Sequence, residues 1–320
     1  MEILRESPEP MGATLIARQL KSRGVELGER AVRYHLKIMD ERGLTQLMGQ
    51  RDGRVLTERG VEEVSNALVK DKVGFAISRI AQLAFRTDFN PDTLTGLIPV
   101  NLSLFPKESF SKAIRVMKPA FTTGLCISDL VAVAHEGERF GELVIPPNKV
   151  GLATICSIVI NGTLLKLGVP MDSKFSGILQ IRNNKPLRFV ELIHYAGCSL
   201  DPSEVFIRAK MTSVAEVIRT GEGKILTTYR EIPALCKPIV EEVVAKLKKV
   251  GIEGLLVMGN TSETVCEIPV ELNRIGIILL NGLNPVAAAV EAGIEVDNYG
   301  MSMVIDYDKL VRFKEIMKED

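Results

Sequence analysis

The sequence predicts an α/β region built from two related half-domains, preceded by a small α+β domain. Two amphipathic helical patterns and a hairpin signal fill the first 67 residues. Short apolar strands alternate with helical runs over residues 69–320, and this second segment repeats parts of itself about 125 residues apart. We therefore expect one domain at residues 1–67 and another at 69–320.

The composition is that of a chain with a real core and no dominant charge. Hydrophobic residues make up 46% of the 320 residues, and 40 Lys and Arg balance 40 Asp and Glu, so any surface for nucleic acid must be local. No apolar run is as long as a membrane helix, and the first ten residues lack the apolar segment of a signal peptide. We expect a cytoplasmic protein that does not enter a membrane.

The cysteines indicate neither a disulfide framework nor a zinc site. They are odd in number, widely spread and without any CxxC pair: Cys126, Cys156, Cys198, Cys236 and Cys266. Reduced thiols without a metal or a cofactor are therefore expected.

The N-terminal segment has the pattern of two successive helices. Residues 11–24, MGATLIARQLKSRG, place apolar side chains at helical spacing and end at a glycine, as a glycine-capped helix does. Residues 29–43, ERAVRYHLKIMDERG, predict a second helix with Arg30, Arg33 and Lys37 along its outer face. The opposite face is expected to be buried and comprises Ala31, Val32, His35, Leu36 and Met39.

A hairpin signal follows the second helix. In GLTQLMGQRDGRVLT, residues 43–57, the Asp52-Gly53 dipeptide tolerates the positive φ angles of a tight turn. Helix, turn, helix and hairpin make up a winged helix-turn-helix, which places its second helix in the major groove of DNA and its wing beside it. The predicted DNA contacts are Arg30, Arg33, Tyr34, Lys37, Arg51 and Arg54.

An ordinary solvated helix face is the alternative, because residues 1–67 carry 11 cations and 11 anions. Their distribution favours DNA: nine cations against five anions lie from Arg18 to Arg54, with the excess on the second helix and the hairpin. One such domain makes few contacts, so tight binding requires two half-sites read by a dimer. We expect a homodimer on double-stranded DNA with an inverted repeat.

Residues 69–320 contain an internal repeat. IPPNKVG at 145–151 matches the longer IPVELNRIG at 268–276, and LGVPMD at 167–172 matches AGIEVD at 292–297. The offset is 125 residues for both matches, but 120 between ING at 160–162 and LNG at 280–282. The repeat predicts two half-domains, about 69–200 and 201–320, in a pseudo-twofold arrangement with a crevice between them.

The change of offset predicts five extra residues in the first copy, within LATICSIVI at 152–160. Polar side chains there precede a predicted strand-to-helix turn, where the backbone N–H groups of a helix start favour an anion. The predicted effector site comprises Thr154, Cys156, Ser157, Asn161, Gly162, Thr163 and Lys174. The alternative is a β-bulge in which Cys156 is a packed thiol.

Three segments together resemble the NrpR family of archaeal nitrogen regulatory repressors: GERAVRYHLK, ICSIVINGTLLKLGVP and AGCSLDP. The resemblance covers nearly the whole chain. It implies a repressor of nitrogen-assimilation genes that binds its operator as a dimer and releases it on binding 2-oxoglutarate. Such a dicarboxylate needs two anion sites, and the predicted turn supplies at least one of them.

An α/β enzyme of small-metabolite chemistry with an accessory winged helix is the alternative function. The chain has three histidines, His35, His135 and His194, and their spacing matches no metal triad and no Ser/His/Asp site. Walker and GxGxxG phosphate loops are also absent from the sequence. We therefore expect a regulator and not an enzyme. A DNA-binding protein without an effector is disfavoured by the size of the C-terminal region.

Overall fold

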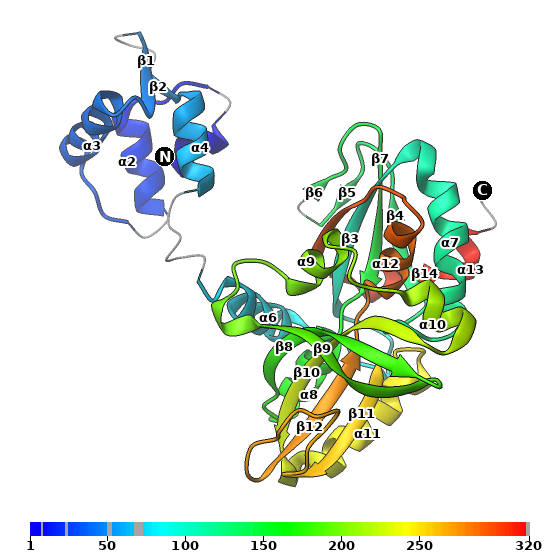
Figure 1. Cartoon of the computed structure of the whole chain (residues 1–320). Coiled ribbons are helices and arrows are strands. Elements are labelled where there is room, and N and C mark those ends of the chain that lie inside the picture. The colour runs from blue at the N-terminus through cyan, green and yellow to red at the C-terminus, as the bar shows by residue number, and fades with distance from the viewer. Residues whose placement is uncertain (8, 23–24, 50–52, 67–72, 142, 318–320) are drawn as a thin grey trace. The chain divides into compact units, whose positions relative to one another are not determined.

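The chain divides into two compact units, Met1–Lys72 and Val73–Asp320 (Figure 1). The structure is a computed structural model and describes all residues except 8, 23–24, 50–52, 67–72, 142 and 318–320. A winged helix precedes an α/β unit, which confirms the predicted fold class. Within the described residues, no helix is both long and apolar enough to cross a membrane.

The first unit is a winged helix around a small apolar core. Helix α3 packs on α2 and β1, while α1 and α4 contact β2. The core includes Ile3, Leu4, Met11, Ile16, Val32 and Leu36. The elements are α1 Glu2–Glu6, α2 Ala13–Ser22, α3 Glu29–Glu41, β1 Thr45–Gly49, β2 Gly53–Leu56 and α4 Glu58–Asn66.

The wing is tied to the body of the first unit through its backbone. Met11 and Arg54 exchange two backbone hydrogen bonds of 3.0 Å each. Gly53 begins β2 with φ +93°, and a Cβ atom there would lie 2.6 Å from the carbonyl oxygen of Met11. Only glycine fits this position without a shift of the backbone.

The prediction that His35 faces the core is wrong. The side chain is exposed, and its ring lies edge-on to that of Tyr34 with the centroids 5.6 Å apart. In α3 only Val32 and Leu36 are fully buried. The small unit covers a narrower stripe of this helix than the apolar pattern suggested.

The second unit contains two antiparallel five-stranded sheets, ordered β13-β3-β7-β4-β14 and β11-β12-β10-β8-β9. The strands are β3 Leu97–Pro106, β4 Leu130–Ala134, β7 Lys149–Ile155, β8 Asp172–Arg182, β9 Lys185–His194, β10 Gly223–Pro233, β11 Leu255–Thr261, β12 Arg274–Leu280, β13 Asp297–Asp306 and β14 Val311–Arg312. The small hairpin β5 Arg139–Phe140 and β6 Leu143–Val144 stands apart from both sheets.

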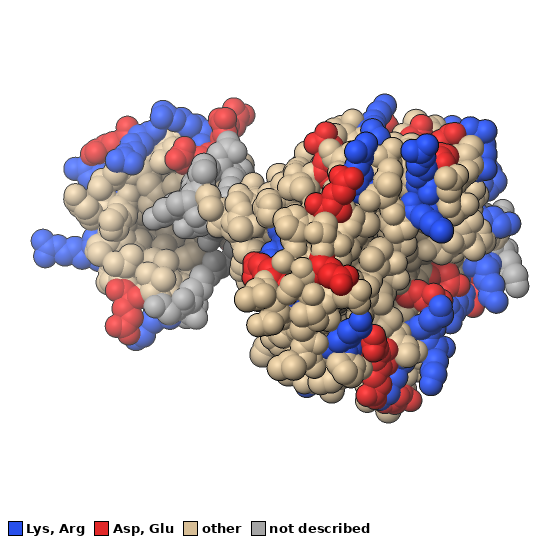
Figure 2. All heavy atoms as spheres, turned by 60° about the horizontal axis from the view of Figure 1, so that its bottom comes forward, with Lys and Arg blue, Asp and Glu red and all other residues tan. Residues whose placement is uncertain are grey.

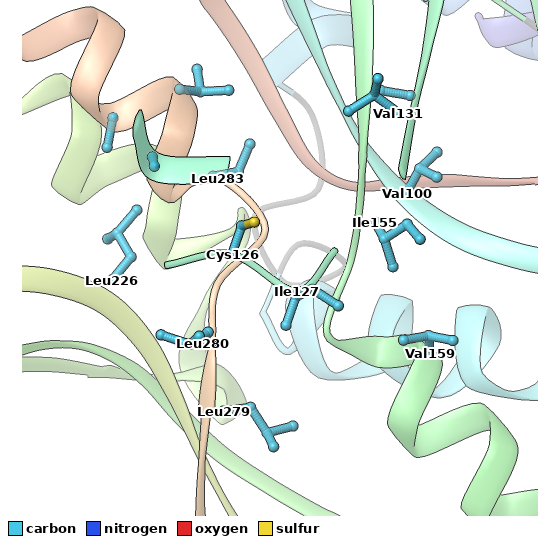
Figure 3. Close-up of a cluster of buried hydrophobic side chains, with 14 of the residues drawn as sticks. Val100, Cys126, Ile127, Val131, Ile155, Val159, Leu226, Leu279, Leu280 and Leu283 are labelled. Atoms are coloured by element: carbon cyan, nitrogen blue, oxygen red, sulfur yellow. The ribbon is translucent and has the colours of Figure 1, made fainter. Parts of the chain in front are cut away.

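Helices cover these sheets, and one apolar core joins the two halves. The helices are α6 Phe75–Arg86, α7 Phe110–Thr122, α8 Ile158–Lys166, α9 Pro202–Arg208, α10 Val214–Thr220, α11 Lys237–Lys249, α12 Asn284–Glu291 and α13 Phe313–Ile316. Figure 3 shows Val100 and Ile155 of the first sheet in the same cluster as Leu226 and Leu279 of the second. Strands β3 and β10 are both buried along most of their length. Strand β3 is mostly apolar, as expected for a strand buried on both faces, whereas β10 also buries Thr227, Thr228, Arg230 and Glu231.

The two halves repeat the same order of elements and exchange a strand. The order β3, α7, β4, β7, α8, β8 recurs as β10, α11, β11, β12, α12, β13. Strand β8 of the first half pairs with β10 of the second, and β13 of the second half pairs with β3 of the first. Asp172 lies opposite Glu231 and Asp297 opposite Leu104, at equivalent positions of the two pairs. Each sheet is therefore completed by the other half.

The predicted five-residue insertion in the first half is wrong. Strands β7 and β12 have equal lengths and begin at Lys149 and Arg274, which are 125 residues apart. Gly168 and Gly293, just beyond α8 and α12, keep this offset and share a left-handed conformation with φ of +75° and +80°. The two Asn-Gly pairs are not equivalent, because 161–162 lies inside α8 whereas 281–282 precedes α12.

Helix α6 lies directly against α8, and a glycine permits the close approach. A Cβ atom on Gly162 would lie 2.6 Å from Cγ2 of Thr87 and 2.9 Å from the carbonyl oxygen of Ala84. Thr87 is fully buried, and its hydroxyl donates to the carbonyl of Leu83 at 2.8 Å. Because both helices are closely packed here, α6 and α8 cannot separate without losing packing contacts.

We expect Gly162→Ala to destabilise the chain by ~1–3 kcal/mol, because the overpacking outweighs the gain in helix propensity. Urea unfolding monitored by circular dichroism measures this change. Gly197→Ala is the control, since no heavy atom lies within 4 Å of its added Cβ and its φ is not positive. Equal stability of both variants would contradict the tight α6–α8 contact.

A bulge in β13 connects α6, β3 and α9. Met301 has φ +49°, and its N–H donates to Oδ1 of Asn101 at 3.0 Å. Arg79 of α6 donates to the carbonyl oxygens of Met301 and Ser302. Glu204 of α9 accepts from the N–H of Gly300 at 2.8 Å. Burial raises the pKa of Glu204 from 4.5 to about 7, against the effect of that hydrogen bond.

The raised pKa of Glu204 predicts that the chain loses stability as pH rises. Between its unfolded pKa near 4.5 and its folded pKa of about 7, the folded state binds more protons than the unfolded state. The melting temperature should therefore fall from pH 5 to pH 8, and Glu204→Gln should flatten this fall. Differential scanning calorimetry across that range is the measurement. An unchanged slope in Glu204→Gln would rule out Glu204 as a source.

Candidate functional site

The predicted turn residues Cys156 and Ser157 stand between β7 and α8. The N–H of Cys156 donates to the carbonyl of Pro99 at 2.9 Å, which extends the pairing of β7 with β3 by one residue. Ser157 is the N-cap of α8, yet its hydroxyl caps no backbone N–H group of the helix. Both side chains are buried. The hydroxyl of Ser157 is used instead by a side chain from the other half.

That side chain is Arg230, from the middle of β10. Its Nη2 donates to Oγ of Ser157 at 2.7 Å, and its Nη1 donates to the carbonyl oxygen of the same residue at 3.2 Å. Nη1 also lies 3.7 Å from the sulfur of Met171. The bulge that sets β10 against β8 places Ser173 opposite Arg230.

The guanidinium of Arg230 is buried without a counter-charge in contact. Arg230 is 1% exposed, its Nε has no hydrogen-bond partner, and no ion pair involves it within the part of the chain described. Burial lowers its pKa, and the nearby Tyr195, Cys156 and Asp201 act in the opposite direction. Because arginine remains protonated in proteins, a desolvated positive charge is held here.

Tyr195, Cys156 and Asp201 are the ionisable neighbours whose charges act on this cation. Burial raises the pKa of Cys156 to about 11 and also raises that of Tyr195, so both are protonated at neutral pH. Burial likewise raises the pKa of Asp201, against the effects of Ser203 and of the Arg230 charge. Cys156 is therefore a thiol and lacks the thiolate character of a nucleophile. Cys156 is therefore a buried, packed thiol, as the alternative interpretation of the sequence had it.

A cavity of about 280 Å³ lies beside this cation, between α6 and α8. Met171 belongs to its wall and touches Arg230, so the guanidinium lies behind this wall. Asn161 and Ser173 also line it, joined by a hydrogen bond of 3.2 Å, and Oδ1 of Asn161 is buried without a partner. The remaining lining residues are Ile77, Ile80, Ala81, Ala84, Leu165, Pro170 and Asp172.

The structure does not bring Lys174 to this cavity. Its Nζ lies 2.7 Å from carboxylate oxygens of Asp172 and Glu271 and 3.8 Å from Glu231. Successive residues of a strand point to opposite faces, so Ser173 faces Arg230 and Lys174 faces away from it. The cation of the site comes from β10 instead of β8.

The other predicted effector residues are placed around the site or apart from it. Asn161, Gly162 and Thr163 lie inside α8 and not at its start. Gly162 contacts α6, while the hydroxyl of Thr163 donates to the carbonyl of Val159 and lines a separate groove of about 660 Å³. Thr154 is buried in β7, where its hydroxyl lies 3.5 Å from Nδ2 of Asn101. Cys156, Ser157 and Asn161 remain as neighbours of Arg230 or of the cavity.

Reasoning from the sequence missed Arg230. Its signal was available: within GKILTTYREIP an Arg-Glu pair interrupts a strand that is otherwise apolar or weakly polar. Buried charges are rare unless they are paired or functional. Position 230 could not be joined to position 157, however, without knowing that the halves exchange strands.

The equivalent position in the other half lacks these groups. By the strand registers, Ser103 corresponds to Arg230, and it donates to Oδ1 of Asn298 at 2.8 Å. Gly282 corresponds to Ser157, and a Cβ there would lie 2.9 Å from Nδ2 of Asn101. Of the two equivalent places, and among the residues described, only the one formed by Arg230 and Ser157 has a buried cation and a hydroxyl partner.

In the first unit, the outer row of α3 is exposed. The side chains of Arg33 and Lys37 are 69% and 74% exposed, and Tyr34 is 64% exposed. Arg30 is exposed beside them. Arg33 pairs with Glu29, and Lys37 lies 3.9 Å from Glu41. Figure 2 shows basic and acidic side chains interspersed over the face drawn.

Arg54 is engaged within the fold. Its Nε lies 2.7 Å from Oδ2 of Asp40, and its side chain is 20% exposed. Asp40 also accepts from the hydroxyl of Thr45 at 2.5 Å. This link fastens β2 to the end of α3 and leaves Arg54 less available to DNA than was predicted. Arg51 lies outside the described residues.

Comparisons with known proteins agree for both units. Residues 73–312 match the family described as NrpR regulatory domains NRD1 and 2, and residues 1–64 match the ribonuclease R winged-helix domain. A crystal structure of a nitrogen repressor-like protein from Methanococcus jannaschii superposes with a TM-score of 0.64 at 26% identity, covering 75% of this chain and 99% of that one.

Curated relatives extend the similarity over nearly the whole chain. The global nitrogen regulator NrpRI of Methanosarcina mazei is 42% identical over 97% of this chain and 95% of its own length. The global nitrogen regulator NrpR of Methanococcus maripaludis is 33% identical over 93% of this chain and 51% of its own length. These relatives are named as regulators and not as enzymes. The chain thus belongs to the NrpR family of nitrogen regulators.

Proposed function

We propose that this chain is a repressor of nitrogen-assimilation genes that binds an inverted-repeat operator as a homodimer and leaves it on binding 2-oxoglutarate beside Arg230. One observation carries the effector part: a fully buried guanidinium has no carboxylate in contact and lies behind Met171, which lines a cavity. An anionic ligand would supply the missing counter-charge. Membership in a family of nitrogen regulators supports the choice of 2-oxoglutarate among small dicarboxylates.

The arrangement offers two different ends to a dicarboxylate. At one end, the free Nε of Arg230 and the hydroxyl of Ser157 can receive a carboxylate in charge-assisted hydrogen bonds, at the N-terminus of α8. At the other end, the amide of Asn161 and the hydroxyl of Ser173 line the cavity. Met171 lies between them, so its flexible side chain must move for one ligand to reach both ends.

The DNA part rests on the exposed row of α3. A recognition helix reads base edges in the major groove with side chains of its first turns, so Arg30, Arg33 and Tyr34 are assigned to bases and Lys37 to phosphate. Glu29 and Glu41 compete with DNA for Arg33 and Lys37, but exposed pairs of this kind are weak. Arg54 is assigned to positioning the wing, through Asp40.

Replacing Arg230 by methionine should abolish the response to 2-oxoglutarate. Loss of a buried charge-assisted contact costs about 2–5 kcal/mol of binding free energy, that is, a rise in Kd of roughly 30-fold or more. The melting temperature should stay the same or rise, because an unpaired buried charge is itself costly. Calorimetric titration of the full chain with 2-oxoglutarate measures the change in Kd. Thermal unfolding measures the change in melting temperature.

Lys174→Met is the matched control, since it removes a cation from the opposite face of the same sheet. It should leave the affinity for 2-oxoglutarate unchanged. Unaltered binding in Arg230→Met, or loss in Lys174→Met alone, would remove Arg230 from the site. Absence of heat in the parent chain would point to a different effector.

For DNA, we expect Arg33→Ala to weaken operator binding by ~1–3 kcal/mol and to relax its sequence preference. Gel-shift titrations against the operator and a scrambled duplex at one salt concentration measure both effects. Arg54→Ala should instead lower the thermal stability of the winged unit, because it breaks the link to Asp40. Arg33→Ala binding both duplexes as the parent does would refute the role of α3.

A further inference from the structure

Buried polar atoms without a partner are concentrated in the middle of β10. Among the described residues, five buried side-chain nitrogen or oxygen atoms have no hydrogen-bond partner, and four of them belong to residues 227–231. The four are Oγ1 of Thr227, Oγ1 of Thr228, Nε of Arg230 and Oε2 of Glu231. Buried polar groups are normally hydrogen-bonded, so each unpartnered atom in this short segment requires an explanation.

The alternation of side chains divides these four residues between the two faces of the sheet. Pairing with β12 is regular here, so Thr228 and Arg230 share one face while Thr227 and Glu231 share the other. Oε2 of Glu231 has an opposite charge nearby, because Nζ of Lys174 lies 3.8 Å away. On the other face, the hydroxyl of Thr228 and Nε of Arg230 are two donors side by side that no described residue uses.

The other half shows how the same fold satisfies these two positions. Ser103 of β3 is the counterpart of Arg230, and its hydroxyl donates to another side chain at 2.8 Å. Asn101, two residues earlier, is therefore the counterpart of Thr228. Oδ1 of Asn101 accepts from the N–H of Met301 at 3.0 Å. The fold thus supplies protein partners at both positions in one half, and the unpartnered donors are particular to the half that carries the cation.

We propose that Thr228 is a ligand contact: its hydroxyl and Nε of Arg230 together hold one carboxylate of the effector. The proposal rests on the proposed function, in which 2-oxoglutarate binds beside Arg230. Neighbouring residues on one face of a strand lie about 6.5 Å apart, and a carboxylate accepts hydrogen bonds of about 2.5–2.9 Å at each of its two oxygens. One carboxylate therefore reaches both donors once Met171 has moved, and it gives each donor the partner that it lacks.

The adjacent Thr227 offers a matched comparison. Both threonines are buried, with 0% and 2% of their surface exposed, and neither hydroxyl has a partner. The next residue on the face of Thr227 is Tyr229, whose hydroxyl donates to Glu231 at 3.1 Å. Only Thr228 stands beside the guanidinium. A contribution to ligand binding is therefore expected from one of two adjacent threonines that are equally buried.

The test is calorimetric titration of the full chain with 2-oxoglutarate in the parent, Thr228→Val, Thr228→Ser and Thr227→Val forms. Valine keeps the shape of threonine without its hydroxyl, so Thr228→Val should raise Kd by about 10-fold or more, as expected for loss of a hydrogen bond to a charged group. Thr228→Ser keeps the hydroxyl and should restore most of the affinity. Thr227→Val should bind as the parent does.

Thermal unfolding of the same variants separates a ligand contact from a structural role. Each valine removes a buried hydroxyl that has no partner, so the melting temperature should stay the same or rise in both variants. A stable Thr228→Val variant with weakened binding, rescued by Thr228→Ser, supports the proposal. A lower melting temperature in Thr228→Val than in Thr227→Val would show that the hydroxyl has a partner within the protein, and would overturn it.

The remaining outcomes distinguish this proposal from the proposed function. Unchanged affinity in Thr228→Val, or an equal loss in Thr227→Val, overturns the role of Thr228. If Arg230→Met loses the ligand while Thr228→Val keeps it, the effector site stands and only the second donor is refuted. Absence of heat in the parent chain would overturn the proposed effector and this contact together.

Discussion

The exchange of β8 and β13 between the two halves is the constraint on which the second unit depends. Because β8 of the first half pairs with β10 of the second, and β13 of the second half pairs with β3 of the first, each sheet is built from strands of both halves. The exchange also places β10 beside β8, close to the start of α8, and so brings Arg230 to Ser157 across 73 residues of sequence. The core shown in Figure 3 is shared for the same reason.

The buried guanidinium of Arg230 is a local source of instability in this fold, because its charge is removed from water. Hydrogen bonds to Ser157 offset only part of the desolvation of Arg230, and its Nε is left without a partner. Elsewhere in the second unit, charges meet partners: Lys149 with Asp297, and Lys174 with Asp172 and Glu271. Arg230 differs from these cations in having no carboxylate partner among the residues that the structure describes.

The duplication creates two equivalent positions, and among the described residues only the one where Arg230 of the second half meets Ser157 of the first carries a buried cation. Equivalent elements and registers recur 125 to 127 residues apart, but Ser103 and Gly282 replace the cation and the hydroxyl. The close approach at Gly282, and the hydrogen bond from Ser103 to Asn298, fill the space with protein atoms. Helix α6 breaks the symmetry further, since it covers α8 and precedes the repeat in the chain.

The sequence by itself determined the winged helix, the α/β class and the duplication, because periodicity, turn residues and repeated segments are local signals. It also pointed to Cys156 and Ser157. Only the tertiary structure decided that Arg230 meets Ser157 and that Lys174 does not, since strand exchange and the face of a side chain depend on register. His35 and the apparent insertion were misjudged for the same reason: burial and equivalence are set by neighbours that are distant in the sequence.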